Sequence, residues 1–598
     1  MNLSQEKRVM LAFALSFVML LLWRSFFMKE PPAPPNKAPS APTAASAPGQ
    51  PGAAPGAKTS QPTPPPAHPV ALPVTEGSKA EEIVVENKLY RVTFSTVGAV
   101  VRSWVLKGYP KGEQVEIIDS AACEALGFPM SLSLADPTLK TQVNQAIYVA
   151  KAYSPQVVPA GQEPAEESGN TFSSPVTLAF TYSDGKIQVK KQFSFSETYS
   201  PKVEVSVFDG QHGLPMEVAW PGGFGDQSLS SAVTALTERA VFETADSGKV
   251  QEVTLTPSFL KRFLPSGGGV NGNELQQDVS GPLVLAGLED RFFAGIFLPE
   301  NPDVKLRINR EVFTPPDWHG DENSKPKPLA VRLAAMNAEP LAFRLFVAPK
   351  ELDLLKSVNP PLDSLVDFGW FSIVAKPLFL ALHFIYDHWI HNYGWAIVLI
   401  TLVINLAMFP LKLKSLKSAQ EMQRIQPIIK GIQDKYKQYK FNDPRKQKMN
   451  EEVMKVYHEH HINPLGSCLP MLVQLPFLYG FYRVLDLSIE LRHAPWIWWL
   501  KDLSAPDPYY ILPISMVVTM FILQRMTPTP TVDPSQQRMM MIMPLMFGFI
   551  FFRLASGLNL YYATSNVIGL GQQFYINRKI RAKDPLLAPA RKPAPAKE

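Results

Sequence analysis

Polar side chains interrupt the apolar runs in the C-terminal third of this 598-residue chain. They are hydroxyls, amides and phenols: Thr401, Asn405, Gln474, Asn559, Tyr561, Tyr562 and Asn566. A helix face turned to lipid offers such groups no hydrogen-bond partner, so they more often face a neighbouring helix or a wet cavity. Groups of this kind bind water and polar guests, and we expect the function to lie in that cavity.

Residue types that catalyse reactions do not occur in a usable arrangement. The long central segment has no nucleophile motif, no phosphate-binding loop and no spacing typical of a metal site. The pairs Glu81-Glu82 and Glu166-Glu167 are typical of solvated loops or strand edges, and His458-Glu459-His460-His461 lacks the zinc spacing HExxH. We therefore expect no catalytic residue, no metal and no cofactor, and the protein is predicted not to be an enzyme.

Composition points to a membrane protein that carries a large soluble domain. The chain is 46% hydrophobic and 19% charged, with a net charge of +5, and its apolar residues concentrate near the N-terminus and in the C-terminal third. The two cysteines, Cys123 and Cys468, fall in different segments, which excludes a disulfide framework.

Six apolar runs are long enough to be membrane spans, because a helix crosses the hydrocarbon core in roughly 20 residues. They are 1–28, Tyr393 to Pro410, Gly466 to Leu485, Pro508 to Leu523, Met539 to Phe552 and Leu558 to Ile576. The first run has no small-x-small cleavage site close behind it, which favours an uncleaved anchor over a signal peptide. The other five form a predicted membrane core over residues 393–577.

The segment before the core falls into three parts. Residues 29–79 are rich in Pro, Ala, Gly, Ser and Thr and are predicted to be a disordered, extended linker. Residues 80–350 alternate with period two, and Ser183-Asp184-Gly185 separates two such runs as a hairpin turn would. The pattern predicts a large antiparallel β sandwich, with Leu341 to Val347 as a plausible closing strand.

Residues 351–392 mix aromatic and charged side chains, which is typical of a helix lying in the membrane interface. Pro377 is expected to break any continuous helix there. His383, His388 and His391 have no common metal-site spacing, and interfacial hydrogen bonding is the favoured interpretation.

A basic insert over residues 411–463 separates the second and third runs. It is predicted to be a helical hairpin, with one helix from Ser415 to Tyr439 and a turn and N-cap at Asn442-Asp443-Pro444. Its lysines, and those of the basic tail at 578–598, place the hairpin and both termini on the cytoplasmic side. The basic face is either a solvated, topology-setting surface or a docking surface for anionic lipids or RNA, and both alternatives stay open.

The chain resembles the YidC membrane-protein insertases of double-membraned bacteria over nearly its whole length. The most specific residues are Asn463-Pro464-Leu465-Gly466 with Cys468 and Pro470, Gln474-Leu475-Pro476, Asp502-Leu503-Ser504, Asp507-Pro508-Tyr509-Tyr510, and Ser556-Gly557 before Tyr561-Tyr562. The resemblance implies a polytopic α-helical core around a hydrophilic groove, and a periplasmic domain of β-supersandwich fold.

The resemblance also implies the groove residues. Thr401 and Tyr562 match groove positions of the family, Gln474 matches a third, and Tyr561 and Asn405 complete the predicted set. Asn405 stands where the family usually carries an arginine that is thought to attract acidic residues of the substrate. We predict that Asn405 hydrates the groove and that Lys412 and Lys414 supply attraction from the cytoplasmic groove mouth.

The predicted function is insertion of nascent membrane proteins into the inner membrane, alone or with the Sec translocon. Other predicted partners are anionic lipids and, through the basic hairpin and tail, the ribosome. Two alternatives remain. A secondary transporter would need acidic residues in its spans, and a membrane-anchored sugar-binding or sugar-processing protein would act through the β domain.

Overall fold

The structure is a computed structural model that describes residues 72–583 except 109–111, 155–165, 168, 211, 229–237, 255–275, 312, 317, 320–327, 336–337, 370, 440–442, 461–468 and 528–533. The predicted anchor, most of the linker and most of the basic tail lie outside the described residues and stay predictions. So do Cys468 and the Asn463-Pro464-Leu465-Gly466 motif.

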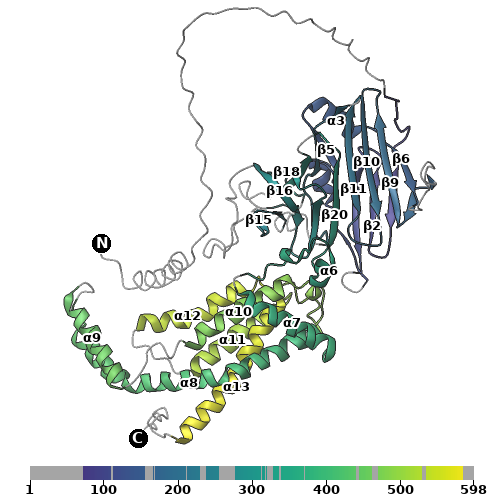
Figure 1. The fold of residues 1–598 in the computed structure, drawn as a ribbon. Coiled ribbons are helices and arrows are strands. Elements are labelled where there is room, and N and C mark those ends of the chain that lie inside the picture. The colour runs from purple at the N-terminus through teal and green to yellow at the C-terminus, as the bar shows by residue number, and fades with distance from the viewer. Residues whose placement is uncertain are drawn as a thin grey trace, which may run out of the picture. The chain divides into compact units, whose positions relative to one another are not determined.

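Strands of the N-terminal half form two sheets (Figure 1). The first sheet has the order β4-β3-β2-β1-β8. Its strands are β1 (Glu82–Glu86), β2 (Tyr90–Ser95), β3 (Val100–Lys107), β4 (Gln114–Glu116) and β8 (Thr171–Ser173). Neighbours pair antiparallel except β1 and β8, which run parallel.

The second sheet has the order β5-β13-β19-β18-β16-β17-β20-β11-β10-β9-β6-β7, with β12, β14 and β15 beside this path. Its strands are β5 (Ser131–Leu134), β6 (Val149–Tyr153), β7 (Glu166–Glu167), β9 (Val176–Ser183), β10 (Ile187–Phe195), β11 (Lys202–Asp209), β12 (His212–Gly213), β13 (Met216–Trp220), β14 (Arg239–Thr244), β15 (Gln251–Thr254), β16 (Gln276–Glu289), β17 (Phe293–Pro299), β18 (Asp303–Arg310), β19 (Leu329–Ala335) and β20 (Leu341–Pro349).

The two sheets pack face to face through the residues that the period-two pattern places on one side. Tyr90, Val92 and Phe94 alternate along β2 and are fully buried. The Phe94 ring lies 5.5 Å from that of Phe180 on β9 and 4.7 Å from that of Phe193 on β10. The predicted antiparallel β sandwich is confirmed for the described strands.

The predicted hairpin turn joins β9 to β10. Asp184 Oδ1 accepts hydrogen bonds from the backbone N–H groups of Lys186 and Ile187, both at 2.8 Å. Gly185 has φ +90°, a conformation that suits glycine. The predicted closing strand is β20, but it pairs with both β11 and β17 and lies inside the sheet instead of at its edge.

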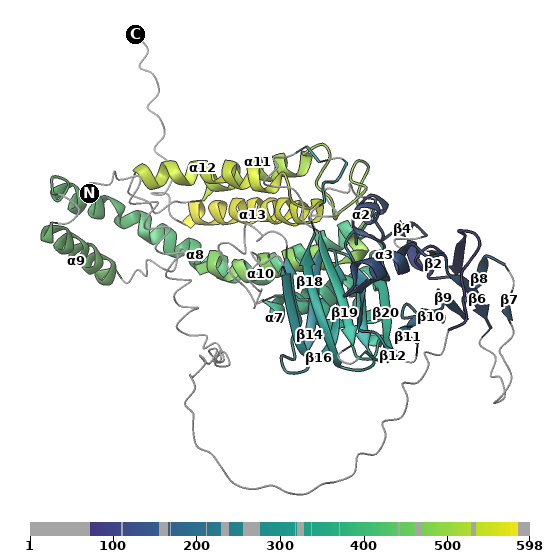
Figure 2. The same cartoon turned by 90° about the horizontal axis from the view of Figure 1, so that it is seen from above.

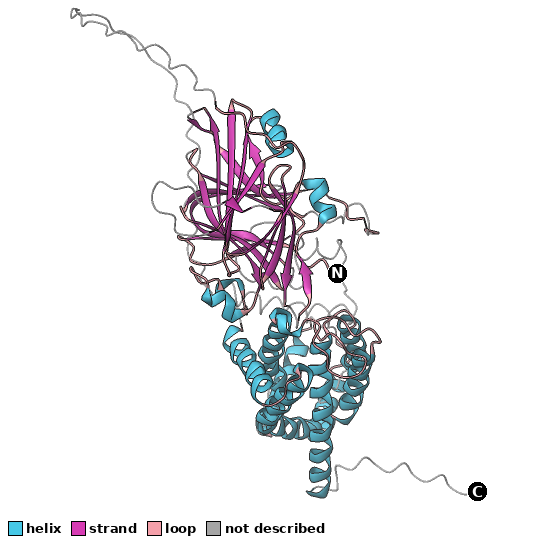
Figure 3. Ribbon diagram, turned by 90° about the vertical axis from the view of Figure 1, so that its right-hand side faces the viewer, coloured by secondary structure: helices cyan, strands magenta, loops and turns pink. Residues whose placement is uncertain are grey.

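Most helices of the described chain gather in a region apart from the strands (Figure 3). The helices are α2 (Ser120–Leu126), α3 (Pro137–Gln145), α6 (Leu352–Ser357), α7 (Ser372–His388), α8 (Tyr393–Lys435), α9 (Pro444–Glu459), α10 (Leu469–Leu487), α11 (Ile511–Met526), α12 (Pro534–Phe551) and α13 (Ser556–Lys583), with short 3-10 turns at η2 (Asp363–Leu365) and η4 (Ile489–Leu491).

The expected break at Pro377 is wrong, because α7 runs through it. Pro377 lies in the second turn, where its missing N–H would have bonded the carbonyl of Ile373. Ile373 stands at the start of the helix and is 84% exposed, so only one hydrogen bond at the helix end is lost. Burial of Leu378, Leu382 and Ile385 holds the rest of the helix against its neighbours.

The second apolar run and the first helix of the insert form one helix, α8, which passes Pro410 and Pro427 without ending. The separate helix predicted from Ser415 is therefore wrong. Asp443 caps α9 as predicted, with its side chain accepting from the N–H of Arg445 at 2.9 Å. Met422, Ile425 and Ile429 of α8 pack against Val453, Val456 and Tyr457 of α9.

Among the described helices, α8 alone is long and apolar enough to cross a membrane by length and composition. α11 and residues 541–551 of α12 are shorter apolar helices. α8, α10, α11, α12 and α13 lie side by side in both views (Figures 1 and 2), and α13 packs against both α8 and α11.

Candidate functional site

A small pocket opens between α8, α10 and α13. The residues that line it are Ile404, Asn405, Met408 and Lys412 from α8, Gln474 and Phe477 from α10, and Tyr561 and Ser565 from α13. Polar groups from three apolar helices therefore meet at one place. The pocket brings together four of the predicted site residues: Asn405, Lys412, Gln474 and Tyr561.

Asn405 stands at the centre of the pocket's hydrogen bonds. It is 4% exposed, and its Nδ2 donates to the Thr401 carbonyl at 2.9 Å and to Ser565 Oγ at 3.2 Å. Its side-chain Oδ1 accepts from Lys412 Nζ at 2.8 Å, and its backbone carbonyl accepts from Gln572 Nε2 at 3.1 Å. Every polar end of this buried amide has a partner, as a low-dielectric site requires.

Lys412 brings a positive charge to Asn405. The two residues are seven apart on α8, two turns of one face, and Lys412 Nζ donates to Asn405 Oδ1 at 2.8 Å. The same ammonium donates to Gln572 Oε1 on α13 at 3.2 Å. Both acceptors are neutral amides, and within the described residues the structure gives Lys412 no carboxylate partner.

The other predicted site residues lie outside the pocket lining. Thr401 is fully buried, and its hydroxyl donates to the carbonyl of Ile397 one turn earlier, at 2.6 Å. Tyr562 packs edge-on against Phe551, with ring centroids 4.7 Å apart. Lys414 is exposed. Thr401 supports Asn405 through its carbonyl, whereas Tyr562 packs beside the pocket's Tyr561.

Two further polar residues of the apolar runs tie helices together. Asn559 is fully buried and its Nδ2 donates to the carbonyls of Phe551 and Leu554 at the turn before α13. Asn566 Nδ2 donates to the Met516 carbonyl on α11 at 3.3 Å. These residues join neighbouring segments of the core instead of lining the pocket.

Sequence reasoning missed Ser565 and Gln572, which complete the pocket's hydrogen bonds. With Tyr561 they stand at positions i, i+4 and i+11 of α13, one face of a helix. A helical-period count of polar residues in the sixth apolar run, continued past its apolar part, would have found both.

The pocket is narrow in this structure. Its cavity volume is about 10 Å³, close to the space that one water needs. The side chain of Lys412 occupies the gap between α8 and α13. A guest larger than water must therefore displace Lys412 or separate the helices.

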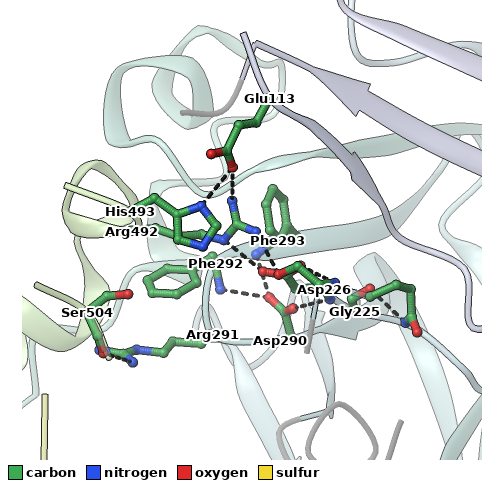
Figure 4. A network of polar contacts seen from close by, with 12 residues as sticks. Glu113, Gly225, Asp226, Asp290, Arg291, Phe292, Phe293, Arg492, His493 and Ser504 are labelled. Carbon is green, nitrogen blue, oxygen red and sulfur yellow. Dashed lines mark hydrogen bonds and ion pairs between the residues drawn. The ribbon is translucent and has the colours of Figure 1, made fainter. Parts of the chain in front are cut away.

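A second polar cluster joins the β sandwich to the loop between α10 and α11 (Figure 4). Arg492 is 3% exposed, and its Nε donates to Asp226 Oδ2 at 2.7 Å while Nη2 donates to Ser228 Oγ at 3.0 Å. His493 Nδ1 lies 2.7 Å from Glu113 Oε2, and this carboxylate also lies 3.7 Å from Arg492 Nη1. Arginine with a close carboxylate is the strong form of buried ion pair.

The same cluster is braced from the strand side. Asp290 Oδ1 accepts from the N–H groups of Phe292 and Phe293 at 2.7 and 2.6 Å, and Oδ2 accepts from the N–H of Asp226 at 2.9 Å. Arg291 then reaches across to the carbonyls of Asp486 and Ser504 at 2.9 and 3.0 Å. These contacts fix the loop against the sandwich and involve no residue of the pocket.

Comparison with known proteins first defines the class. Residues 384–583 match the family model of the 60Kd inner membrane protein, and residues 82–381 match that of the YidC periplasmic domain. The helical region with the pocket thus matches a family of inner-membrane proteins, and the β sandwich matches a periplasmic domain.

The chain belongs to the YidC family. It is 31% identical over 589 residues to the membrane protein insertase YidC of Syntrophus aciditrophicus, covering 96% of this chain and 100% of the relative. It is 34% identical over 600 residues to that of Geobacter metallireducens, covering 97% and 99%. A crystal structure of an active YidC insertase with its first transmembrane domain resolved is 20% identical, with a TM-score of 0.33 over 85% of this chain and 95% of that one.

Proposed function

We propose that this protein inserts hydrophobic segments of nascent membrane proteins into the inner membrane, and that the pocket between α8, α10 and α13 receives their polar flanks. The observation that carries the proposal is the meeting of Asn405, Lys412 and Gln572 inside otherwise apolar helices. Family membership supports the same activity, since the full-length relatives are named membrane protein insertases.

The proposed topology has about six membrane spans. The anchor at 1–28 and helices α8, α10, α11, α12 and α13 cross the bilayer, and α7 lies in its interface. The basic hairpin at 411–463 and both termini face the cytoplasm, which agrees with the distribution of lysine and arginine. The β sandwich is periplasmic, as its family model describes.

A polar pocket within the inner half of the bilayer lowers the barrier to insertion. A polar group that enters hydrocarbon without a partner costs several kcal/mol. Asn405, Ser565 and Gln572 offer hydrogen bonds to such a group partway across, so the dry part of the path becomes shorter. The apolar faces of the helices bind a hydrophobic segment no better than lipid does, and the segment leaves into the bilayer.

The Lys412 ammonium supplies the positive charge that the family usually carries on an arginine at the position of Asn405. Its ammonium is held by two neutral amide oxygens at 2.8 and 3.2 Å, so its charge is not cancelled by an internal acid. An acidic residue on a substrate flank attracts it more strongly than an amide does. The exchange frees Asn405 Oδ1 and Gln572 Oε1 and opens the gap between α8 and α13. Exposed Lys414 adds a weaker attraction at the mouth.

The proposed function is a non-enzymatic one. Partitioning of the hydrophobic segment, the membrane potential or a partner supplies the driving force. The Sec translocon, the ribosome and anionic lipids are proposed partners, the last two through the basic hairpin. A transporter is disfavoured because, among the described residues, α8, α10 and α13 place no carboxylate in the pocket lining.

The test is depletion of the protein in cells, followed by scoring insertion of small membrane proteins with short periplasmic tails. Insertion should fall and return when the wild-type gene is expressed. Deletion of the β sandwich separates the alternatives: an insertase keeps much of its activity, whereas a sugar-processing protein loses all of it. Unchanged insertion on depletion would refute the proposal.

A further inference from the structure

A larger pocket lies in the β sandwich, away from the helices and from the proposed insertion site. Its cavity volume is about 250 Å³, which corresponds to roughly eight water molecules at 30 Å³ each. β3, β5, β19, α3 and the loop between α2 and β5 all contribute to its walls. A cavity assembled from five separate segments is a fixed feature of the fold and not a gap under one loop.

Three cations line this pocket from three different elements. Arg102 comes from β3, Arg332 from β19 and Lys140 from α3. No carboxylate stands among the lining residues within the part of the chain that the structure describes. Like charges that converge on one cavity repel one another, and an anion inside the cavity would relieve that repulsion.

Arg102 is the best placed of the three. Its guanidinium lies over the Phe128 ring, 4.1 Å from the centroid, and Phe128 also lines the pocket. The described residues give Arg102 no carboxylate partner. Stacking fixes the plane of the guanidinium while leaving its N–H groups for an acceptor, and a planar fork of donors matches a carboxylate or phosphate.

The other two cations have different roles. Arg332 Nη2 donates to Glu311 Oε1 at 2.9 Å, so part of its charge is balanced from outside the pocket. Lys140 is exposed and stands at the rim. Ser131 and Ser133 of β5 add hydroxyl groups, and Val100, Leu126 and Pro221 supply apolar wall. A few polar groups placed on an apolar wall are typical of small-molecule sites.

We propose that this pocket binds a small organic oxyanion, a carboxylate or phosphate on a compact body, with Arg102 as its main ligand. The size of the cavity excludes a folded partner. A neutral ligand is disfavoured, because it would cover the Arg102 guanidinium without supplying a negative charge to compensate it.

The experiment is isothermal titration calorimetry on the full-length protein in neutral detergent, at low ionic strength. The probes are inorganic phosphate, glycerol 3-phosphate and succinate, with glycerol as the uncharged comparison. At least one anion should bind with a stoichiometry near one, and glycerol should not bind. Arg102→Gln should weaken the binding of that anion at least tenfold.

Two further variants make the result decisive. Arg91→Gln removes an exposed arginine of β2 that pairs with Glu86, and it should leave binding unchanged. Ser133→Met keeps every charge but fills the cavity, and it should reduce binding at least tenfold. Circular dichroism confirms that each variant is folded.

Three results would overturn the proposal. They are absence of saturable binding for all three anions, equal losses in Arg91→Gln and Arg102→Gln, and binding in Ser133→Met that matches the wild type. Anionic lipid vesicles provide the remaining arm. Capture by vesicles that depends on Arg102, without binding of the free anions, would assign the site to a lipid headgroup and refute a soluble ligand.

Discussion

Two cations of this protein, the buried Arg492 and the half-buried Lys412, are held in opposite ways. Arg492 lies against the carboxylates of Asp226 and Glu113, whereas Lys412 lies against the amide oxygens of Asn405 and Gln572. A cation paired with an internal carboxylate has its charge cancelled and can only hold structure together. A cation paired with neutral amides keeps its charge for an incoming group. The difference distinguishes the structural ion pair of Arg492 from the proposed binding site at Lys412.

The largest expected effect comes from breaking the ion pair between Arg492 and Asp226, which joins the β sandwich to the loop between α10 and α11. Arg492→Met removes the guanidinium that donates to the buried Asp226 carboxylate, and removal of one partner of a buried ion pair costs about 3–5 kcal/mol. The thermal unfolding midpoint of the full-length protein should fall by several degrees. The double variant Arg492→Met/Asp226→Leu should recover much of the loss, because both members of the buried Arg492–Asp226 ion pair are then replaced by apolar side chains. A double variant that is less stable than Arg492→Met would contradict this account.

Glu238 is a buried acid whose hydrogen-bond donors, among the described residues, are backbone N–H groups. It is 1% exposed and accepts from the N–H groups of Phe224 and Leu329. Burial raises the pKa of Glu238 from 4.5 to about 8. The folded state therefore holds a proton that the unfolded chain releases between these values, and stability falls as the pH rises through this window.

The matching variant is Glu238→Gln, which cannot titrate. Relative to this variant, the wild type should lose on the order of 3 kcal/mol between pH 5 and pH 8. Thermal unfolding midpoints measured at both pH values for both proteins give the difference. Parallel pH profiles would show that Glu238 is ionised in the folded state.

For the binding site, Lys412→Met should slow insertion of a substrate with an acidic periplasmic flank by about tenfold, equal to about 1.4 kcal/mol. Insertion of the same substrate with a neutral flank should change little. Lys414→Met is the matched control, because this exposed lysine should contribute less than a twofold effect. Asn405→Arg should rescue Lys412→Met, since it returns a cation to the pocket. Failure of both flank dependence and rescue would rule out the charge-exchange step.

The smallest effect is expected from a variant that gives the Lys412 ammonium an ion-pair partner within the protein. Gln572→Glu places a carboxylate beside Lys412, so the ammonium gains an internal partner like that of Arg492. Insertion of the acidic-flank substrate should fall about threefold, because exchange with the substrate now has to break an ion pair, while the unfolding midpoint should not decrease. Gln572→Met supplies the control that removes the amide without adding charge. Faster insertion in Gln572→Glu would argue against the comparison.

Patterns local in the sequence predicted local structure well. Apolar runs predicted both ends of α10 and α11 to within three residues, period two predicted the β sandwich, and Asp443 marked the start of α9. Each of these depends on neighbours within one or two turns. α12 begins five residues before its predicted start, and α13 ends seven residues after its predicted end. Pro377 and Pro410 misled the prediction because tertiary packing compensates for one missing hydrogen bond.

Contacts between distant segments could not be predicted from one sequence. Arg492 and Asp226 are 266 positions apart, and no local pattern links them. Lys412 and Asn405 share a helix face, and the spacing of seven suggested a connection. The acceptor Gln572 lies 160 positions beyond Lys412, so the bridge between α8 and α13 needed the structure.

The unbroken course of α8 has a mechanical consequence. Its 43 residues span about 65 Å, from the aromatic belt at Tyr393 to the basic hairpin. Asn405 and Lys412 lie in this helix on either side of Pro410, whose missing N–H removes one backbone hydrogen bond and makes the helix easier to bend there. A force applied to α9, which packs against α8, should therefore be transmitted along α8 to Asn405 and Lys412 in the pocket.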